Sequence, residues 1–265
     1  MLAAVFSFVA TQNALGADCP RDPKVDAWAA KNIPIYRAVI FGETHGTSEI
    51  PRVFLEYVCA ASRVSSELLV GLEISGKSLQ MAKHAIEAKQ RGDDQNSALR
   101  ASEFWLKGHD GRSSKANFQL IEHLVELENK GKLVLVGFDA RGPGPENFGA
   151  TAVAEIMKNV PKKWQSWRVV LLTGRGHSDF GSGESSLAEP LASEGLRTLT
   201  VQISHGGGTA WVCQAGACGP SNRVGVGCDN PARVPGTYRN IDGLRSDADL
   251  CIGKITASEP MLLPE

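Results

Sequence analysis

Short apolar, β-branched runs alternate with longer amphipathic stretches over most of this chain, and this alternation constrains the fold more than any other feature. Five runs have the length and composition of strands: Tyr36–Phe41, Leu68–Ile74, Lys132–Phe138, Arg168–Thr173 and Thr198–Ile203. Helical patterns follow them at Ser48–Ser62, Ser78–Arg91, Lys115–Asn129, Gly149–Asn159 and Ser185–Glu194. Continuous apolar strands separated by helices are typical of βαβ units, in which helices cover both faces of a parallel sheet. The pattern therefore predicts an α/β protein with a mostly parallel central sheet.

The chain is predicted to form one domain. Its 265 residues allow one large α/β domain or two small ones, and no internal repeat divides it. A polar stretch over residues 94–114 includes a helical pattern at Ser97–Trp105. After Ser204, Gly, Pro and Cys replace the regular pattern, apart from weak strands at Thr209–Cys213 and Leu250–Thr256. We expect a single domain over residues 17–265, with its core at about 35–205 and a tail at 206–265.

The cysteines indicate an oxidising compartment. There are six, an even number, at Cys19, Cys59, Cys213, Cys218, Cys228 and Cys251. Disulfides would stabilise the loop-rich tail by reducing the entropy of its unfolded state. The sequence does not choose among the alternative pairings. A zinc site is the other interpretation, but no second close pair follows Cys213 and Cys218.

The first 16 residues have the pattern of a secretory signal peptide. An apolar run, Leu2–Ala10, precedes Ala14 and Gly16, which are the small residues expected just before cleavage at Ala17. A buried N-terminal helix is the alternative. Together with the cysteines, the signal predicts a periplasmic or secreted protein.

The charge balance argues against two classes of partner. The chain has 28 basic and 29 acidic residues and a formal net charge of −1, so it lacks the broad basic footprint of nucleic-acid binders. No apolar run reaches the roughly 18 residues that suggest a membrane-spanning helix. We expect a small-molecule or peptide substrate instead.

Polar residues gather where the predicted strands end. In open parallel sheets, ligands bind outside the carboxyl ends of the strands. If the predicted strands form such a sheet, these residues share one crevice. They are Glu43, His45, Glu73, Asp139, Arg141, Arg175, His177 and His205.

The residue types in this set suit hydrolysis. A neutral imidazole can take a proton from water near pH 7, and a neighbouring carboxylate orients it and stabilises its charged form. Two histidines and two carboxylates could instead hold a divalent metal that activates water. Glu73 lies inside an apolar run, where an ionised carboxylate needs a partner. The other histidines, His84, His109 and His123, are expected at the surface.

A competing motif is a phosphate-binding loop, because Gly71–Ser78 matches G-x-x-x-x-G-K-[ST], and Leu133–Asp139 could be the later strand that ends in a magnesium-holding Asp. Against this, Leu72, Glu73 and Ile74 continue a strand, and Glu73 would repel phosphate. A secreted protein also has little access to nucleoside triphosphates. Neither G-x-S-x-G nor H-E-x-x-H occurs. A two-carboxylate glycosidase stays open, although nothing selects a carboxylate pair.

The ordered motifs resemble the erythromycin esterase, ChaN and Tiki superfamily. They are Phe41–Thr47 (FGETHGT), Gly71–Glu73 (GLE), Asp110–Ser114 (DGRSS), a strand ending at Asp139, and Gly-x-x-His at Gly174–His177. The resemblance covers about residues 35–205. It implies a three-layer α/β sandwich with its site at the carboxyl ends of the strands. Esterase-type members hydrolyse a macrolide lactone with a histidine base, Tiki-type members are metal-dependent proteases, and ChaN-type members bind haem.

By position, the resemblance implies that Glu43, His45, Glu73 and His177 are the functional residues. Arg and Gly precede His177 where ChaN-like proteins commonly have a small or amide residue, and the helical insertions of macrolide esterases are missing. A macrolide substrate is therefore not expected.

The leading hypothesis is a hydrolase of an ester, lactone or peptide. His45 would activate water, directly or at a divalent metal held by Glu43, His45, Glu73 and His177, and His177 would ligate the metal or stabilise the oxyanion. Residues on the substrate side would be Arg141, Arg175, Asp139 and His205, with the two arginines holding an anionic group. The alternative is a non-enzymatic haem or metal binder, with His45, His177 or Tyr36 as axial ligand.

Overall fold

The computed structural model describes residues 19–107, 111–139, 148–160, 166–181, 183–214, 217–226, 228, 230–237 and 246–262. The predicted signal peptide at 1–16 lies outside the described residues, as do His109, Asp110 and Arg141.

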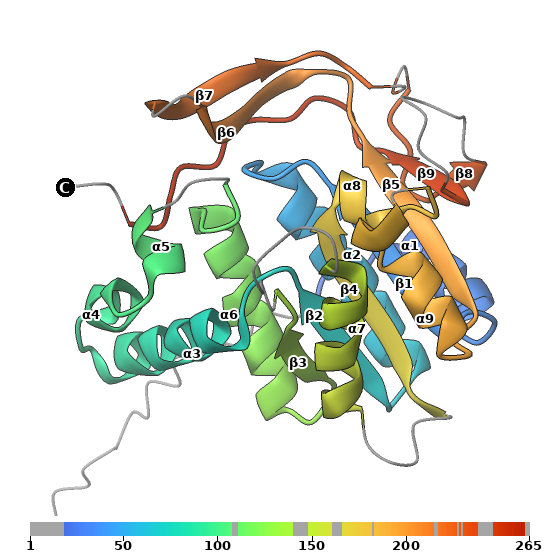
Figure 1. Ribbon diagram of the computed structural model, residues 1–265, viewed down its shortest axis with the longest axis horizontal. Coiled ribbons are helices and arrows are strands. Elements are labelled where there is room, and N and C mark those ends of the chain that lie inside the picture. Colours follow the sequence, from blue (N-terminus) through green and yellow to red (C-terminus); the bar gives the residue numbers. More distant parts are fainter. Residues whose placement is uncertain are drawn as a thin grey trace, which may run out of the picture.

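A seven-stranded sheet forms the centre of the described fold (Figure 1). Its strand order is β3-β2-β4-β1-β5-β9-β8, and all neighbouring strands are parallel except β8 and β9. The strands are β1 (Ala38–Glu43), β2 (Leu68–Leu72), β3 (Val134–Gly137), β4 (Arg168–Gly174), β5 (Thr198–Ser204), β8 (Gly236–Thr237) and β9 (Ala248–Cys251). Strand β1 is buried along its whole length because β4 and β5 flank it. The predicted α/β class and mostly parallel sheet are confirmed.

Helices cover both faces of the sheet, which gives three layers. On one face, residues of α1 (Pro23–Asn32), α2 (Glu49–Val64), α3 (Gly76–Arg91) and α6 (Lys115–Asn129) share a core with alternate strand residues such as Val39. On the other face, α7 (Phe148–Asn159) and α9 (Ala188–Ser193) pack with the intervening strand residues such as Ile40. The alternation follows because successive strand side chains point to opposite faces.

Several element boundaries differ from the sequence predictions. The weak strand predicted at Leu250–Thr256 is β9, which begins at Ala248 and ends at Cys251. The strand predicted to end at Ile74 ends at Leu72, because Glu73 and Ile74 turn out of the sheet toward the site. The helical pattern at Ser97–Trp105 forms two short helices, α4 (Gln95–Arg100) and α5 (Glu103–Lys107). Ser185–Glu194 contains the last residue of a 3₁₀ turn, η3 (Gly183–Ser185), followed by α9.

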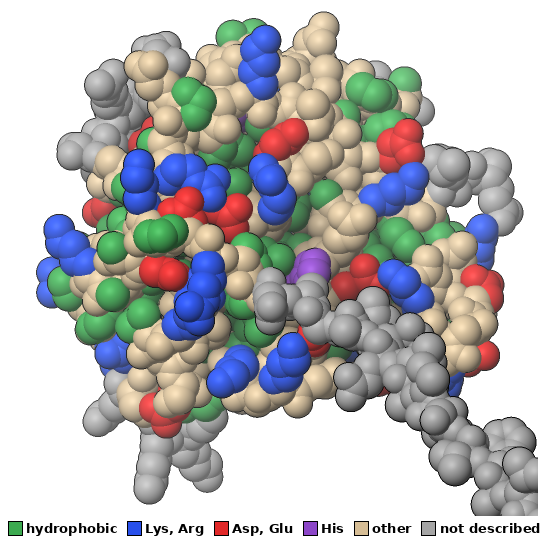
Figure 2. Space-filling view, turned by 180° about the vertical axis from the view of Figure 1, so that it is seen from behind, with side chains coloured by type: hydrophobic (Ala, Val, Ile, Leu, Met, Phe, Trp, Pro, Cys, Tyr) green, Lys and Arg blue, Asp and Glu red, His purple; other side chains and the backbone are tan. Residues whose placement is uncertain are grey.

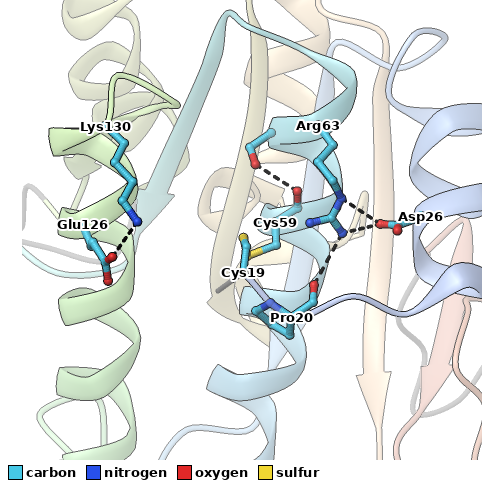
Figure 3. Close-up of a disulfide and its surroundings, with 8 residues drawn as sticks. Cys19, Pro20, Asp26, Cys59, Arg63, Glu126 and Lys130 are labelled. Carbon is cyan, nitrogen blue, oxygen red and sulfur yellow. Dashed lines mark hydrogen bonds and ion pairs between the residues drawn. A yellow bond between two sulfur atoms is a disulfide. The ribbon is translucent and has the colours of Figure 1, made fainter. Parts of the chain in front are cut away.

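Three disulfides join all six cysteines: Cys19–Cys59, Cys213–Cys218 and Cys228–Cys251. The prediction of a disulfide-tied tail is thereby confirmed, and Cys213 and Cys218 are not zinc ligands. Cys19–Cys59 ties the segment before α1 to α2, where Arg63 also bonds Asp26 and the Pro20 carbonyl (Figure 3).

The tail crosses the edge of the sheet where the parallel strands end. Its hairpin consists of β6 (Gly208–Gln214) and β7 (Ala217–Arg223), which pair antiparallel. The C-terminal segment, Ile255–Leu262, runs beneath the hairpin and contacts it (Figure 1). None of the helices in the described part of the chain has the length and apolar character needed to cross a membrane.

Candidate functional site

The carboxyl ends of the parallel strands bring together most of the predicted site residues. Glu43 is the last residue of β1, Glu73 follows β2, and Asp139 lies two residues after β3. His177 lies in α8 (Arg175–Ser178), a short helix that directly follows β4. Strand β4 lies between β1 and β2, so residues from all three strands meet at one place.

Glu73 is at the centre of this cluster and is buried, with a relative exposure of 5%. One carboxylate oxygen, Oε1, accepts a bond from Arg112 Nη1 at 2.7 Å. The other, Oε2, accepts bonds from Thr173 Oγ1 and the Gly174 amide, both at 2.6 Å. Burial raises the pKa of Glu73, but the charges of His45 and Arg112 and these hydrogen bonds outweigh it, so the net pKa is lowered. Glu73 is therefore a fixed negative charge at neutral pH.

Arg112 also belongs to this cluster, although it is not among the site residues predicted from the sequence. It is as buried as Glu73, and its Nη1 also donates to Asp139 Oδ2 and to the Glu73 carbonyl, each at 3.0 Å. Asn117 Nδ2 donates to the Arg112 carbonyl at 3.0 Å. Asp139, predicted on the substrate side, is placed in this buried ion pair instead. Two features of the sequence could have indicated Arg112: the Asp110–Ser114 motif contains it, and Glu73, a carboxylate in an apolar run, requires a cationic partner.

His45 is held by Glu43. Its Nδ1 lies 3.0 Å from Glu43 Oε1, and because a carboxylate accepts, Nδ1 carries the hydrogen and Nε2 is left as the basic nitrogen. Nε2 lies 4.0 Å from Glu73 Oε2. Burial lowers the pKa of His45 and Arg112 opposes protonation, but the Glu43 charge and hydrogen bond together with the Glu73 charge raise it overall. The side chain is 22% exposed, so solvent reaches it.

His177 faces the same carboxylate from the other side. Its Nδ1 lies 3.0 Å from the Ser185 carbonyl, which can only accept, so Nε2 is again the nitrogen directed at the site. Nε2 lies 4.0 Å from Glu73 Oε1, and the ring lies 4.1 Å from that of Phe148. Gly174 keeps this space open, because a Cβ there would stand 2.9 Å from His45 Nε2. Two oriented imidazoles thus flank one buried carboxylate.

Two other predicted residues, His205 and Arg175, are bonded in the described part of the chain to groups other than Glu73 and His45. His205 follows β5 but is only 2% exposed, and its Nδ1 accepts a bond from the Gly207 amide at 3.2 Å. Arg175 is half-buried, and its carbonyl accepts bonds from Ser178 and Gln202. Tyr36 precedes β1 at the opposite edge of the sheet, under the Arg197 guanidinium, so it cannot join His45 in holding a haem.

The phosphate-loop interpretation is not supported by the local geometry. Gly71 is paired within the sheet, next to Val136 and Leu171, and Gly76 already begins α3. A Cβ at Gly71 would stand 2.5 Å from the Leu171 side chain, so this glycine serves strand packing. The segment between forms no cradle of amides, and the buried Glu73 occupies its centre.

The four predicted metal ligands do not fit a metal ion as they are placed. Both oxygens of Glu73 are occupied by donors, Glu43 is engaged with His45, and the Arg112 guanidinium adds a positive charge. No three His, Cys, Asp or Glu side chains within the described ranges are arranged to hold a metal. The donor set suits a histidine base better than a metal centre.

A small cavity lies behind the site. It has a volume of about 10 Å³ and is lined by Glu43, Glu73, Arg112, Asn117 and aliphatic side chains, which is room for about one water and not for a porphyrin. Glu43 Oε2 is buried there without a hydrogen-bond partner among the described residues.

On the face shown in Figure 2, basic and acidic side chains are interspersed and a histidine reaches the surface.

Acidification is expected to destabilise the protein through His205. Burial and the charges of Arg175 and Arg223 lower the pKa of His205 in the folded chain. Below about pH 6.5 the unfolded chain therefore binds a proton at His205 more readily than the folded chain does, and the free energy of unfolding decreases as the pH is lowered. Because Asn can still accept from Gly207, His205→Asn should weaken this dependence in chemical unfolding at pH 7 and pH 5. The exposed His84→Asn serves as control. A pH dependence in His205→Asn equal to that of the wild type would contradict this origin.

Comparison with known proteins supports the fold. No protein-family model and no curated protein matches the chain. Among solved structures, it is similar to a Bacillus cereus protein (TM-score 0.55, 9% identity, covering 92% of this chain and 100% of that one). It is also similar to the type III effector HopBA1 (TM-score 0.52, 12% identity, covering 88% and 95%). ChaN of Campylobacter jejuni, solved with cofacial haem, matches with a TM-score of 0.38 and 14% identity over 69% of this chain and 86% of that one. The first two similarities show that the chain shares a known α/β fold.

Proposed function

We propose that the protein is a hydrolase in which His45 acts as a metal-free general base on water. The observation that carries the proposal is the 3.0 Å contact between His45 Nδ1 and Glu43, which leaves Nε2 as the basic nitrogen of a side chain that is 22% exposed. A base oriented by a buried carboxylate is the arrangement that hydrolases use to activate a nucleophile.

One imidazole, that of His45, would move the proton. Water beside His45 loses a proton to Nε2 while its oxygen attacks the carbonyl carbon of an ester, lactone or peptide. When the bond to the leaving group breaks, His45 passes this proton from Nε2 to the leaving group and returns to its neutral form. Glu43 and Glu73 stabilise the imidazolium that forms at His45.

The proposal extends to the compartment. Three disulfides are typical of proteins that fold outside the reducing cytosol. We propose that the protein is secreted or periplasmic and meets its substrate there.

A screen of chromogenic esters, lactones and peptides tests this function. Protein stripped of metal with a chelator should hydrolyse its best substrate as fast as untreated protein. Loss of turnover on stripping, with recovery on adding a divalent metal, would refute the metal-free base. Haem binding through His45 or His177, whose side chains are 22% and 32% exposed, is the second candidate, and a Soret band after haem titration would support it.

Glu43→Gln should change the pH profile in a defined direction. The amide oxygen of the introduced glutamine can still accept from His45 Nδ1, but loss of the negative charge lowers the pKa of His45. The acid limb of kcat/KM should therefore move to lower pH, while its maximum falls on the order of 10²-fold, because the imidazolium loses its counter-charge. Glu122→Gln on α6, which removes an exposed ion pair with Lys89, should leave both the acid limb and the maximum of kcat/KM unchanged. An acid limb that stays in place would contradict this role of Glu43.

A further inference from the structure

Two glycines hold the turns that carry the central side chains of the site. Gly46 directly follows His45 and has φ +75°, and Gly111 directly precedes Arg112 and has φ +81°. A Cβ at Gly111 would lie 2.4 Å from Gly46 Cα and 2.7 Å from the Trp211 carbonyl oxygen. A Cβ at Gly46 would lie 2.2 Å from the same carbonyl oxygen. The two turns and strand β6 are therefore in direct main-chain contact.

Hydrogen bonds fix this contact. The Gly46 carbonyl accepts from the amides of Trp211 in β6 and Ser258 in the C-terminal segment, both at 2.9 Å. The C-terminal segment also bonds the second turn, because the Met261 amide donates to Ser113 at 2.8 Å. It is tied to β6 in turn, since the Thr209 amide donates to Ile255 at 2.9 Å. The hairpin and the C-terminal segment thus form one layer over both turns (Figure 1).

Both turns place a side chain on the same carboxylate. Arg112 reaches Glu73 Oε1 at 2.7 Å, and His45 Nε2 stands 4.0 Å from Glu73 Oε2. The relative position of the turns therefore sets the distance between the base and its charged surroundings. A misplacement of about 1 Å in a reacting group can cost on the order of 10²-fold in rate.

We propose that hairpin β6–β7 is a positioning element of the candidate active site, with the Trp211 main chain holding the Gly46 and Gly111 turns, and through them His45 and Arg112, in place. Gly46 and Gly111 are then positioning residues. This inference rests on the proposed function of His45. The hairpin lies in the tail, outside the part of the chain that carries the motifs.

Alanine substitution with a matched control tests the inference. Gly92 at the end of α3 has φ +80°, and a Cβ there meets nothing within 4 Å. Gly92→Ala therefore carries the same backbone strain as Gly111→Ala without the clash. The readout is the titration of the His45 ring followed by NMR, which needs no substrate. In Gly111→Ala the pKa of His45 should move toward about 6.5 and kcat should fall at least about tenfold, with KM less affected, while Gly92→Ala keeps wild-type values.

Removal of disulfides tests the same inference without touching the turns. Cys213–Cys218 closes the hairpin two residues beyond Trp211, whereas Cys19–Cys59 closes a longer loop away from the site. Cys213→Ser/Cys218→Ser should lower kcat several-fold and shift the His45 titration. Cys19→Ser/Cys59→Ser should lower Tm more than the hairpin variant does, because it opens the longer loop. It should leave kcat and the His45 titration unchanged.

A wild-type His45 titration in both the Gly111 and the hairpin-disulfide variants would overturn the positioning role. If Gly111→Ala does not fold, the disulfide pair decides alone. Failure to find any hydrolysis would count against the proposed function and not against the positioning role, because the NMR titration reports on geometry without turnover.

Discussion

His45→Asn should abolish hydrolysis while leaving the fold intact. Asn can keep a donor for Glu43 Oε1 in place of His45 Nδ1, but it offers no basic nitrogen where Nε2 stands. Loss of a general base costs about 10²–10⁴-fold in rate, so kcat/KM should fall by about this factor or become undetectable. Tm should stay close to that of the wild type, because the buried Glu43 keeps a partner. His45→Ala is less informative, since it also leaves the Glu43 carboxylate buried and unpaired.

His84→Asn is the control for this prediction. His84 is exposed on α3 and bonds the neighbouring Gln80, so the same substitution there should change neither kcat/KM nor Tm. A fully active His45→Asn protein would remove His45 from the mechanism.

Arg112→Met should cause the largest loss of stability among these substitutions. Methionine has a similar length but no charge, so the buried carboxylates of Glu73 and Asp139 would lose their shared cationic partner. Breaking a buried ion pair on one side costs about 3–5 kcal/mol, which for a chain of this size lowers Tm by about 10 °C. The loss should shrink on acidification, because a Glu73 freed from Arg112 has a raised pKa and can become neutral.

Arg91→Met gives the matched comparison. Arg91 pairs with Asp93 at 3.0 Å, and both side chains are largely exposed, so the same substitution should change stability by less than about 0.5 kcal/mol. Equal losses of stability in the two variants, measured by chemical unfolding, would contradict the role of Arg112 as the buried counter-ion.

The sequence predicts the sheet well because burial on both faces leaves a direct signal. The five predicted strands all form, and the polar residues after them converge, since parallel strands end at one edge. The position of β4 between β1 and β2 in the sheet could not be predicted from the pattern of apolar residues. Periodicity reports which face of an element is buried and carries no information on its neighbours.

The partners within the site were the harder part. Glu73 signalled that a cation must face it, but Arg112 lies 39 residues away and meets it only through the fold. His205 was expected near the substrate from its place after β5, yet the hairpin and the following bridge to Val226 bury it. The contact of Trp211 with Gly46 and Gly111 involves main-chain atoms, so the pattern of side chains in the sequence could not predict it.

The most direct test of the central claim is the titration of His45 followed by NMR in the wild-type protein. Glu43 and Glu73 are predicted to raise the pKa of His45 above the ordinary histidine value of about 6.5, and neutral His45 should carry its hydrogen on Nδ1. A pKa at or below 6.5, or a hydrogen on Nε2 in the neutral ring, would contradict a histidine base oriented by Glu43.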